Sequence, residues 1–390
     1  MGYWGYLGPG RRRRVAIGVT IGVLLGAPLA HAWASGIHRA AGVAPAAYGW
    51  GNNASGEVAD GTTVNRTTPV AMVGFGGVAT MAVGVSHGVA VQANGAVISW
   101  GHNRSGQLGD GGTTDRLTPG PVPGLASVTR VAAGNASSLA LKSDGSVFAW
   151  GNNASGQLGD GSAPTDHSSP VAVSGFGPGS GIVALAAGAT HVLALKSDGS
   201  VFAWGNNASG QLGDGSAPTD HATPVPVSGL GSGSGVTRIV GGGAQSFAIK
   251  SDGSLLAWGN NASGQLGDGS APTDQHTPVT VGGLPRIVDL ATGRAHTVAL
   301  AANGAVLAWG DNNRGQLGDG TATRQPTPVA VSGLGAGSNV AAVFASGDHT
   351  HGLVASASVV PPGQQNPAGV TAVSAAPAAH AVVSGPRTTG

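Results

Sequence analysis

The sequence predicts an all-β protein, a β-propeller built from four-stranded blades. A tryptophan recurs every 50 to 54 residues through most of the chain, a period that indicates a propeller, a solenoid or a domain array. Short apolar runs alternate with glycine turns inside each repeat, and helical periodicity is nowhere persuasive. Four antiparallel strands in each repeat are typical of a propeller blade. The recurring residues, which we predict to be the structural core of the blades, are Trp50, Trp100, Trp150, Trp204, Trp258 and Trp309.

One repeat illustrates the four strands. Apolar runs at residues 191–195 and 201–204 predict two strands, joined through Asp198-Gly199. This dipeptide favours a tight two-residue hairpin, whose central residues need positive φ. Residues 224–227 and 236–240 predict two more strands. The prolines of the former suit an outer edge strand, because a central strand would lose ladder hydrogen bonds there.

Three motifs of this repeat carry a family resemblance. They are Gly188-Ala189-Thr190-His191, Asp198-Gly199, and Trp204-Gly205-Asn206-Asn207 with Gly210-Gln211-Leu212-Gly213. Together they resemble the repeat of the regulator of chromosome condensation family, over residues 48 to about 356. The resemblance implies a propeller in which each repeat straddles two blades. Kelch repeats share the period, but their paired glycines are not seen here.

The two ends of the array are half-units. The Trp-Gly half and the half that begins at Gly84, Gly134, Gly188, Gly242, Gly293 and Gly347 each occur six times. The first Trp half, Tyr48-Gly49-Trp50, has no hairpin half before it, and the last hairpin half has no tryptophan after it. We therefore expect the ends to pair as one blade that closes the ring and covers two sheet edges. This gives six blades, with the family's usual seven not excluded.

The N-terminus is typical of an export signal. A basic block at Arg11–Arg14 precedes the apolar run Val15–Ala30 and the small-residue site Ala30-His31-Ala32. The run is short for a membrane span, so we predict a secretory signal peptide at residues 1–32. An uncleaved anchor is the alternative. A linker at 33–46, a propeller at 47–358 and an Ala/Pro/Gly-rich tail at 359–390 complete the predicted organisation.

Composition excludes several chemistries. The net charge of +1, with 9% charged residues, creates no field that would attract nucleic acid or an acidic membrane surface. The absence of cysteine excludes disulfides, thiolate metal sites and cysteine nucleophiles. The polar loop at residues 152–161 lacks the converging carboxylates of a calcium site, so we expect its side chains to bond the turn itself. We predict no cofactor.

Three histidines, His87, His191 and His296, take equivalent positions in alternate repeats. They could direct three imidazoles at the central shaft, where a zinc site is conceivable. Ser137 and Gln245 replace them in the intervening repeats. Because serine and glutamine can replace them, a structural role through hydrogen bonds is favoured for these histidines over a zinc site.

Repetition itself disfavours catalysis, because an active site needs different groups converging at one place. We therefore predict a non-enzyme. The variable surface is the loop that follows Leu-Gly-Asp-Gly, whose residues we expect on one face as candidate contact sites. These residues are Asp115, Arg116, Asp166, His167, Asp220, His221, Asp274, Gln275, Arg324 and Gln325.

The resemblance implies three functions. Some members are nucleotide exchange factors for a small GTPase, acting through a wedge for which the even repeat spacing leaves no room. A plant photoreceptor of the family has a tryptophan directly after the glycine that begins the hairpin half. This chain has Ala189 there and no tryptophan at the equivalent position of the other repeats, so we do not expect photoreception. A secreted bacterial member inhibits β-lactamases, and export fits that case. We hypothesise a secreted, monomeric propeller that binds a protein, including the case of an enzyme inhibitor. The alternatives are a glycan or cell-wall binding module and an exchange factor.

Overall fold

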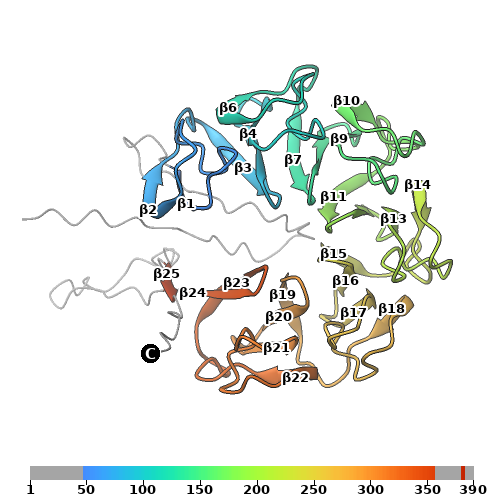
Figure 1. The fold of residues 1–390 in the computed structure, drawn as a ribbon. Helices are drawn as coiled ribbons and strands as arrows, with labels where there is room; N and C mark the ends of the chain where they lie inside the picture. The colour runs from blue at the N-terminus through green and yellow to red at the C-terminus, as the bar shows by residue number, and fades with distance from the viewer. Residues whose placement is uncertain (1–46, 356–378, 383–390) are drawn as a thin grey trace, which may run out of the picture.

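The computed structural model describes residues 47–355 and 379–382. The predicted signal peptide and linker, and most of the predicted tail, lie outside the described residues. The described chain is built from β-strands and contains no helix. The strands form seven sheets, of which five have four strands, one has two and one has three. The sheets follow one another around a centre, as the blades of a propeller do (Figure 1).

The first two complete blades contain β3 (Val78–Val83), β4 (His87–Gln92), β5 (Val97–Gly101), β6 (Arg116–Pro121), β7 (Val128–Ala133), β8 (Ser137–Lys142), β9 (Val147–Gly151) and β10 (His167–Ala172). The next three contain β11 (Ile182–Ala187), β12 (His191–Lys196), β13 (Val201–Gly205), β14 (His221–Pro226), β15 (Val236–Gly241), β16 (Gln245–Lys250), β17 (Leu255–Gly259), β18 (Gln275–Thr280), β19 (Ile287–Thr292), β20 (His296–Ala301), β21 (Val306–Gly310) and β22 (Gln325–Ala330). The partial sheets contain β1 (Tyr48–Gly51), β2 (Arg66–Ala71), β23 (Val340–Ser346), β24 (His349–Ala355) and β25 (Ala379–Val382).

Each complete blade is an antiparallel meander whose strands pair in chain order. The first strand of each blade lines the central channel, and the fourth is the outer edge. The prediction of an outer proline-containing strand is confirmed, because Pro224 and Pro226 lie on β14. There a missing N–H interrupts no hydrogen-bond ladder.

The hairpin between β12 and β13 is longer than predicted. Gly199 has φ of 90° whereas Asp198 does not have positive φ. The Gly199 amide donates to the Lys196 carbonyl over 3.0 Å, and the Lys196 amide to the Ser200 carbonyl over 2.9 Å. One left-handed glycine after an ordinary turn therefore suffices, and Asp198 instead accepts a hydrogen bond from the Ser200 amide.

The hydrophobic core lies between consecutive blades. One cluster, for example, joins Leu139 and Val147 of the second blade to Val192 and Trp204 of the third. Trp100, Trp150, Trp204, Trp258 and Trp309 are at most 1% exposed, which confirms these five as core residues and leaves none of their rings free to stack on a sugar. Each buried indole contributes roughly 4–6 kcal/mol of gross hydrophobic stabilisation.

The two ends of the array form separate sheets in this structure (Figure 1). Among the described residues β1 pairs with β2, and β24 pairs with β23 and with β25 from the predicted tail. Closure through β1 and β24 therefore stays a prediction. Trp50 differs from the core position predicted for it, being 63% exposed, because the loop that would receive its indole joins β21 to β22 at the other end of the array.

Candidate functional site

The loop that joins the third and fourth strands of each blade is held together by one buried asparagine. In the second blade this residue is Asn153, which is fully buried. Its amide nitrogen donates to Asp160 and Ser162, while its side-chain oxygen accepts from the Leu158 amide. The Asp166 carboxylate accepts from the Asn153 backbone amide over 2.8 Å. The prediction that the polar motif bonds its own turn is confirmed.

A second contact fixes the start of the outer strand to the same loop. The aspartate of the Leu-Gly-Asp-Gly motif, which is Asp60 of Val58-Ala59-Asp60-Gly61 in the first repeat, binds a side chain six or seven residues later in the sequence. Burial alone would raise the pKa of Asp60, but hydrogen bonds from Thr62 and Arg66 lower it to about 2. The contacts are Asp60–Arg66 at 2.5 Å, Asp110–Arg116 at 2.9 Å, Asp160–His167 at 3.0 Å, Asp214–His221 at 3.0 Å, Asp268–Gln275 at 2.9 Å and Asp319–Gln325 at 3.3 Å.

The candidate contact residues are therefore mainly internal bonding groups. Asp115, Asp166, Asp220 and Asp274 each accept a backbone amide of their own loop. Arg324 reaches the loop of the preceding blade, where its Nη1 donates to the Ala262 carbonyl over 2.7 Å.

The structure brings these loops to one end of the blades, because each of the five joins the third strand of its blade to the fourth. Each loop also nests on the next blade. A Cβ on Gly156 would lie 2.5 Å from Ala222 Cα, and one on Gly159 would lie 2.6 Å from Trp204 Nε1. Both glycines also have positive φ.

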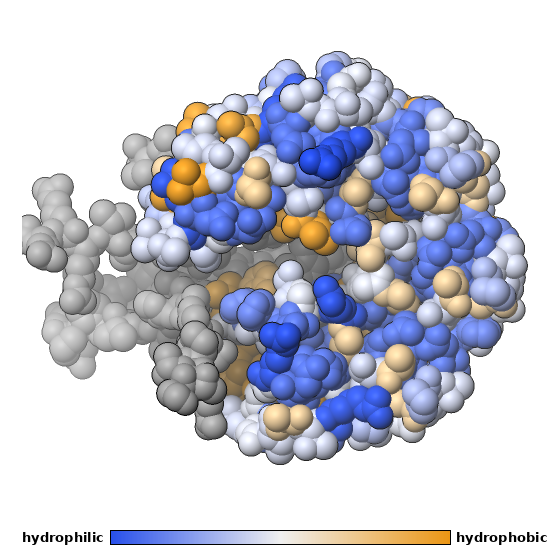
Figure 2. Space-filling view, viewed as in Figure 1, coloured by the Kyte–Doolittle hydropathy of each residue, from blue (hydrophilic) through white to orange (hydrophobic). Residues whose placement is uncertain are grey.

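Three identical loop tips project beyond this bonded framework. They have the sequence Ala-Pro-Thr and follow one another in the second, third and fourth blades. Sequence reasoning singled out the Asp-His and Asp-Gln pairs beside them, although the exact repetition of Ala-Pro-Thr was the available signal. The exposed residues are Pro164, Thr165, Pro218, Thr219, Pro272 and Thr273. Figure 2 shows a largely hydrophilic rim around the ring and hydrophobic residues at its central opening.

The three equivalent histidines lie between blades and do not meet in the shaft. His191 Nε2 lies 2.9 Å from Ser246 Oγ of the next blade, and that hydroxyl donates to the Gln211 carbonyl. The hydroxyl has one hydrogen, so His191 Nε2 must be the donor in the first contact. His87 binds Ser138 in the same way, and His296 binds Thr350. The structural role favoured from the sequence is confirmed, and the shaft-facing arrangement is wrong.

These imidazoles are held neutral. Burial lowers the pKa of His87 and His191 to about 4. Their Nδ1 atoms, like that of His296, have no hydrogen-bond partner within the described ranges. A proton there would add a buried charge without an acceptor. Within the described chain no group of three or more His, Asp or Glu residues is placed to hold a metal ion.

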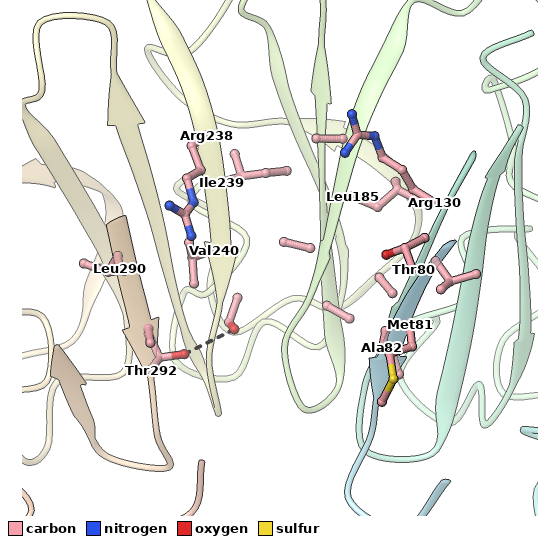
Figure 3. A pocket seen from close by; sticks show the side chains of 18 of the residues that line it. Thr80, Met81, Ala82, Arg130, Leu185, Arg238, Ile239, Val240, Leu290 and Thr292 are labelled. Atoms are coloured by element: carbon pink, nitrogen blue, oxygen red, sulfur yellow. Dashed lines mark hydrogen bonds between the residues drawn. The ribbon is translucent and has the colours of Figure 1, made fainter. Parts of the chain in front are cut away.

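A cavity of about 410 Å³ occupies the central channel. The first strands β3, β7, β11, β15, β19 and β23 all contribute to its wall. Most of the wall consists of small or aliphatic side chains. Arg130 and Arg238 also line the cavity (Figure 3). This cavity was not predicted from the sequence. The sequence feature that could have indicated it is an arginine at the same position of two repeats, Arg130 and Arg238.

The motifs and the blade order agree with comparisons to known proteins. The RCC1-like domain model matches residues 46–368. The chain belongs to the RCC1-like domain family. Human HERC6, a probable E3 ubiquitin-protein ligase, is 38% identical over 151 residues, which cover 38% of this chain and 14% of HERC6. The chain therefore spans a small part of that relative.

The fold is also similar to solved structures. Human WBSCR16 superposes with a TM-score of 0.68 and 25% identity, covering 78% of this chain and 79% of that one. Yeast RCC1 (Prp20), solved bound to Kap60, gives a TM-score of 0.68 and 25% identity, covering 80% of this chain and 77% of its own. In the described part of the RCC1-like chain, no helix is long and apolar enough to cross a membrane.

Proposed function

We propose that this RCC1-like chain is a non-enzymatic propeller that binds a protein partner through the loops between the third and fourth strands of its blades. The observation that carries the proposal is the row of three identical Ala-Pro-Thr tips in consecutive blades, each with an exposed proline and threonine. Equivalent contacts on one partner add their effects, so that weak single contacts give strong overall binding.

The framework beneath the tips supports this role. Asn206 of the third blade donates to Ser155 of the second over 3.4 Å, and Asn260 of the fourth donates to Ser209 of the third over 3.3 Å. The three loops are therefore bonded to one another in series. A surface that is already ordered loses little conformational entropy on binding. The titratable side chains of these loops bond the framework itself, which supports a binding role over a catalytic one.

The test compares two triple variants of the full chain. Thr165→Arg, Thr219→Arg and Thr273→Arg place bulk and charge on the three tips without removing a side-chain bond of the framework. The control places the same side chain on the hairpins at the opposite end of the blades, where residues 143, 197 and 251 are exposed serines. Partners are captured from culture supernatant, identified, and titrated against each variant.

We expect the tip variant to bind the identified partner at least tenfold more weakly and the hairpin variant to bind it as the parent does. Equal binding by both variants would place the interface elsewhere. Retention on cell-wall polysaccharide without a protein partner would favour the glycan alternative. Stimulated nucleotide release from a small GTPase would favour the exchange-factor alternative.

We also propose that the chain is exported. The support is the basic block, the short apolar run and the Ala-x-Ala site near the N-terminus, all of which lie outside the described residues. An exported propeller would meet partners in the medium, which is why the capture experiment uses the supernatant. Inhibition of a secreted enzyme is one form that such binding can take, and it is tested by assaying any captured enzyme with and without the propeller.

A further inference from the structure

Six residues take equivalent positions on the first strands of the blades, which surround the central channel. Each first strand carries a register irregularity near its start, and the residue that follows it pairs with the same position of the second strand. Arg130 pairs with Leu141, for example, and Arg238 with Ile249. This shared register places the six residues at one level of the channel. In blade order they are Thr80, Arg130, Ala184, Arg238, Asp289 and Ala342.

One arginine of this set has a carboxylate partner in the next blade. Arg238 Nη2 lies 2.5 Å from Asp289 Oδ1, and the backbone amide of Leu290 also donates to that oxygen. Asp289 is 6% exposed, and burial raises its pKa to about 6 against the opposing effect of Arg238. The site is therefore poorly solvated, and the arginine in it is matched by one acidic side chain.

Arg130 has the same position and lacks that partner. The next blade presents Ala184 where Asp289 stands beside Arg238. No hydrogen bond or ion pair to the Arg130 guanidinium is formed by the residues that the structure describes. The side chain is half-buried in the cavity wall, and burial lowers the pKa of its guanidinium. A guanidinium that is partly removed from water and has no acceptor from the protein gains from pairing with an anion, so this position is suited to an anion from outside.

The surroundings of Arg130 indicate the rest of the ligand. The cavity volume of about 410 Å³ lies within the range of small-molecule sites. Its wall next to Arg130 is mainly apolar and built from small side chains, with Thr80 as a hydroxyl nearby (Figure 3). Ala132, Ala133, Ala184, Ala186 and Ala187 contribute to it, together with Leu185. An inorganic anion would gain nothing from such a wall, whereas a hydrocarbon chain would be removed from water by it.

We propose that the central channel binds a small organic monocarboxylate with an aliphatic body. The carboxylate pairs with the Arg130 guanidinium above Ala184, in the place that the Asp289 carboxylate takes beside Arg238. The Leu185 amide, equivalent to that of Leu290, is a second donor. Arginine binds carboxylates through two parallel hydrogen bonds, and the aliphatic body lies against the alanines of β7 and β11.

The first experiment titrates the full chain with hexanoate by calorimetry and by ligand-observed NMR. We expect saturable binding of one hexanoate, with a dissociation constant at or below about 1 mM. Hexan-1-ol, which keeps the chain and lacks the charge, should bind on the order of tenfold more weakly. Acetate, which keeps the charge and lacks the chain, should also bind more weakly. Equal binding of acetate and hexanoate would refute the apolar part of the proposal, and no hexanoate binding would refute all of it.

Two variants then test the assigned residues. Arg130→Gln should weaken hexanoate binding on the order of tenfold or more. Arg104→Gln, which changes an exposed loop arginine, should not change it. Ala184→Asp supplies Arg130 with the internal carboxylate that Arg238 has, and it should abolish hexanoate binding while the melting temperature is kept or raised. Ala184→Leu, which fills the same space without charge, provides a second test should the aspartate variant fold poorly. Binding that is unaffected in both Arg130→Gln and Ala184→Leu would overturn the assignment.

Discussion

Replacement of Trp50 by alanine measures whether the two ends of the array meet. Between consecutive blades a tryptophan Nε1 donates to a backbone carbonyl of the preceding loop, as Trp309 does to Gln265 over 2.9 Å. The equivalent carbonyl at the last interface is that of Gln316, which already accepts the Thr350 hydroxyl over 2.8 Å. Trp50 is the residue of the repeat that would complete this interface. We predict that it does so in a closed ring.

The expected magnitude follows from exposure. Trp50 is 63% exposed and Trp309 is 0% exposed. Burying the difference would remove roughly 150 Å² from water, which stabilises the fold by about 4 kcal/mol at ~25 cal/mol per Å². The hydrogen bond to Gln316 would add about 1 kcal/mol. In a closed ring, Trp50→Ala should therefore lower the free energy of unfolding by about 4–5 kcal/mol, against less than about 0.5 kcal/mol for an exposed side chain.

The assay is urea denaturation followed by far-ultraviolet circular dichroism, because tryptophan fluorescence changes with the substitution itself. Trp309→Ala is the matched control and should lose about 3–5 kcal/mol in either case. A free energy of unfolding that Trp50→Ala leaves unchanged, beside a large loss in Trp309→Ala, would refute closure through this residue. The ends would then remain as two separate sheets.

Three further predictions concern the framework and the N-terminus. The pKa of His191 is about 4 in the folded state and near 6.5 in the unfolded state, so the unfolded state binds more protons between these values and the free energy of unfolding falls as the pH falls. At pH 5 the loss is about 2 kcal/mol relative to neutral pH. His191→Gln, which copies the residue of the next repeat, should remove this part of the pH dependence measured by urea denaturation. Asn312→Ala should lower the free energy of unfolding by about 2–3 kcal/mol, because its buried side-chain amide bonds Asp319, Thr321, Thr323 and Leu317. The control Asn313→Ala, at an exposed neighbour, should lower it by less than about 0.5 kcal/mol. Equal losses in the two variants would argue against the loop framework. N-terminal sequencing of protein from the medium should find a start near Trp33, and an intact Met1 in the cytosol would contradict export.

The sequence predicted the blades because strand period, turn residues and tryptophan spacing are local properties that repeat. It did not predict that Trp50 is exposed, because that depends on whether segments three hundred residues apart meet. It assigned Asp166 and His167 to contact a partner, whereas both bond their own loop, since side-chain partners depend on loop geometry. The unpaired Arg130 became visible only when the register placed Ala184 beside it.

The close contact between a loop glycine and the next tryptophan bears on how such an array can grow. Gly159 belongs to one repeat and Trp204, which lies against it, to the next. Residues 142–167 and 196–221 are identical in sequence, so a copied unit brings both a loop that receives an indole and an indole that enters the preceding loop. Duplication of one unit in the gene therefore creates a complete new interface without any compensating substitution. Blade number in such a chain can change in single steps, each of which supplies the residues of its own new interface.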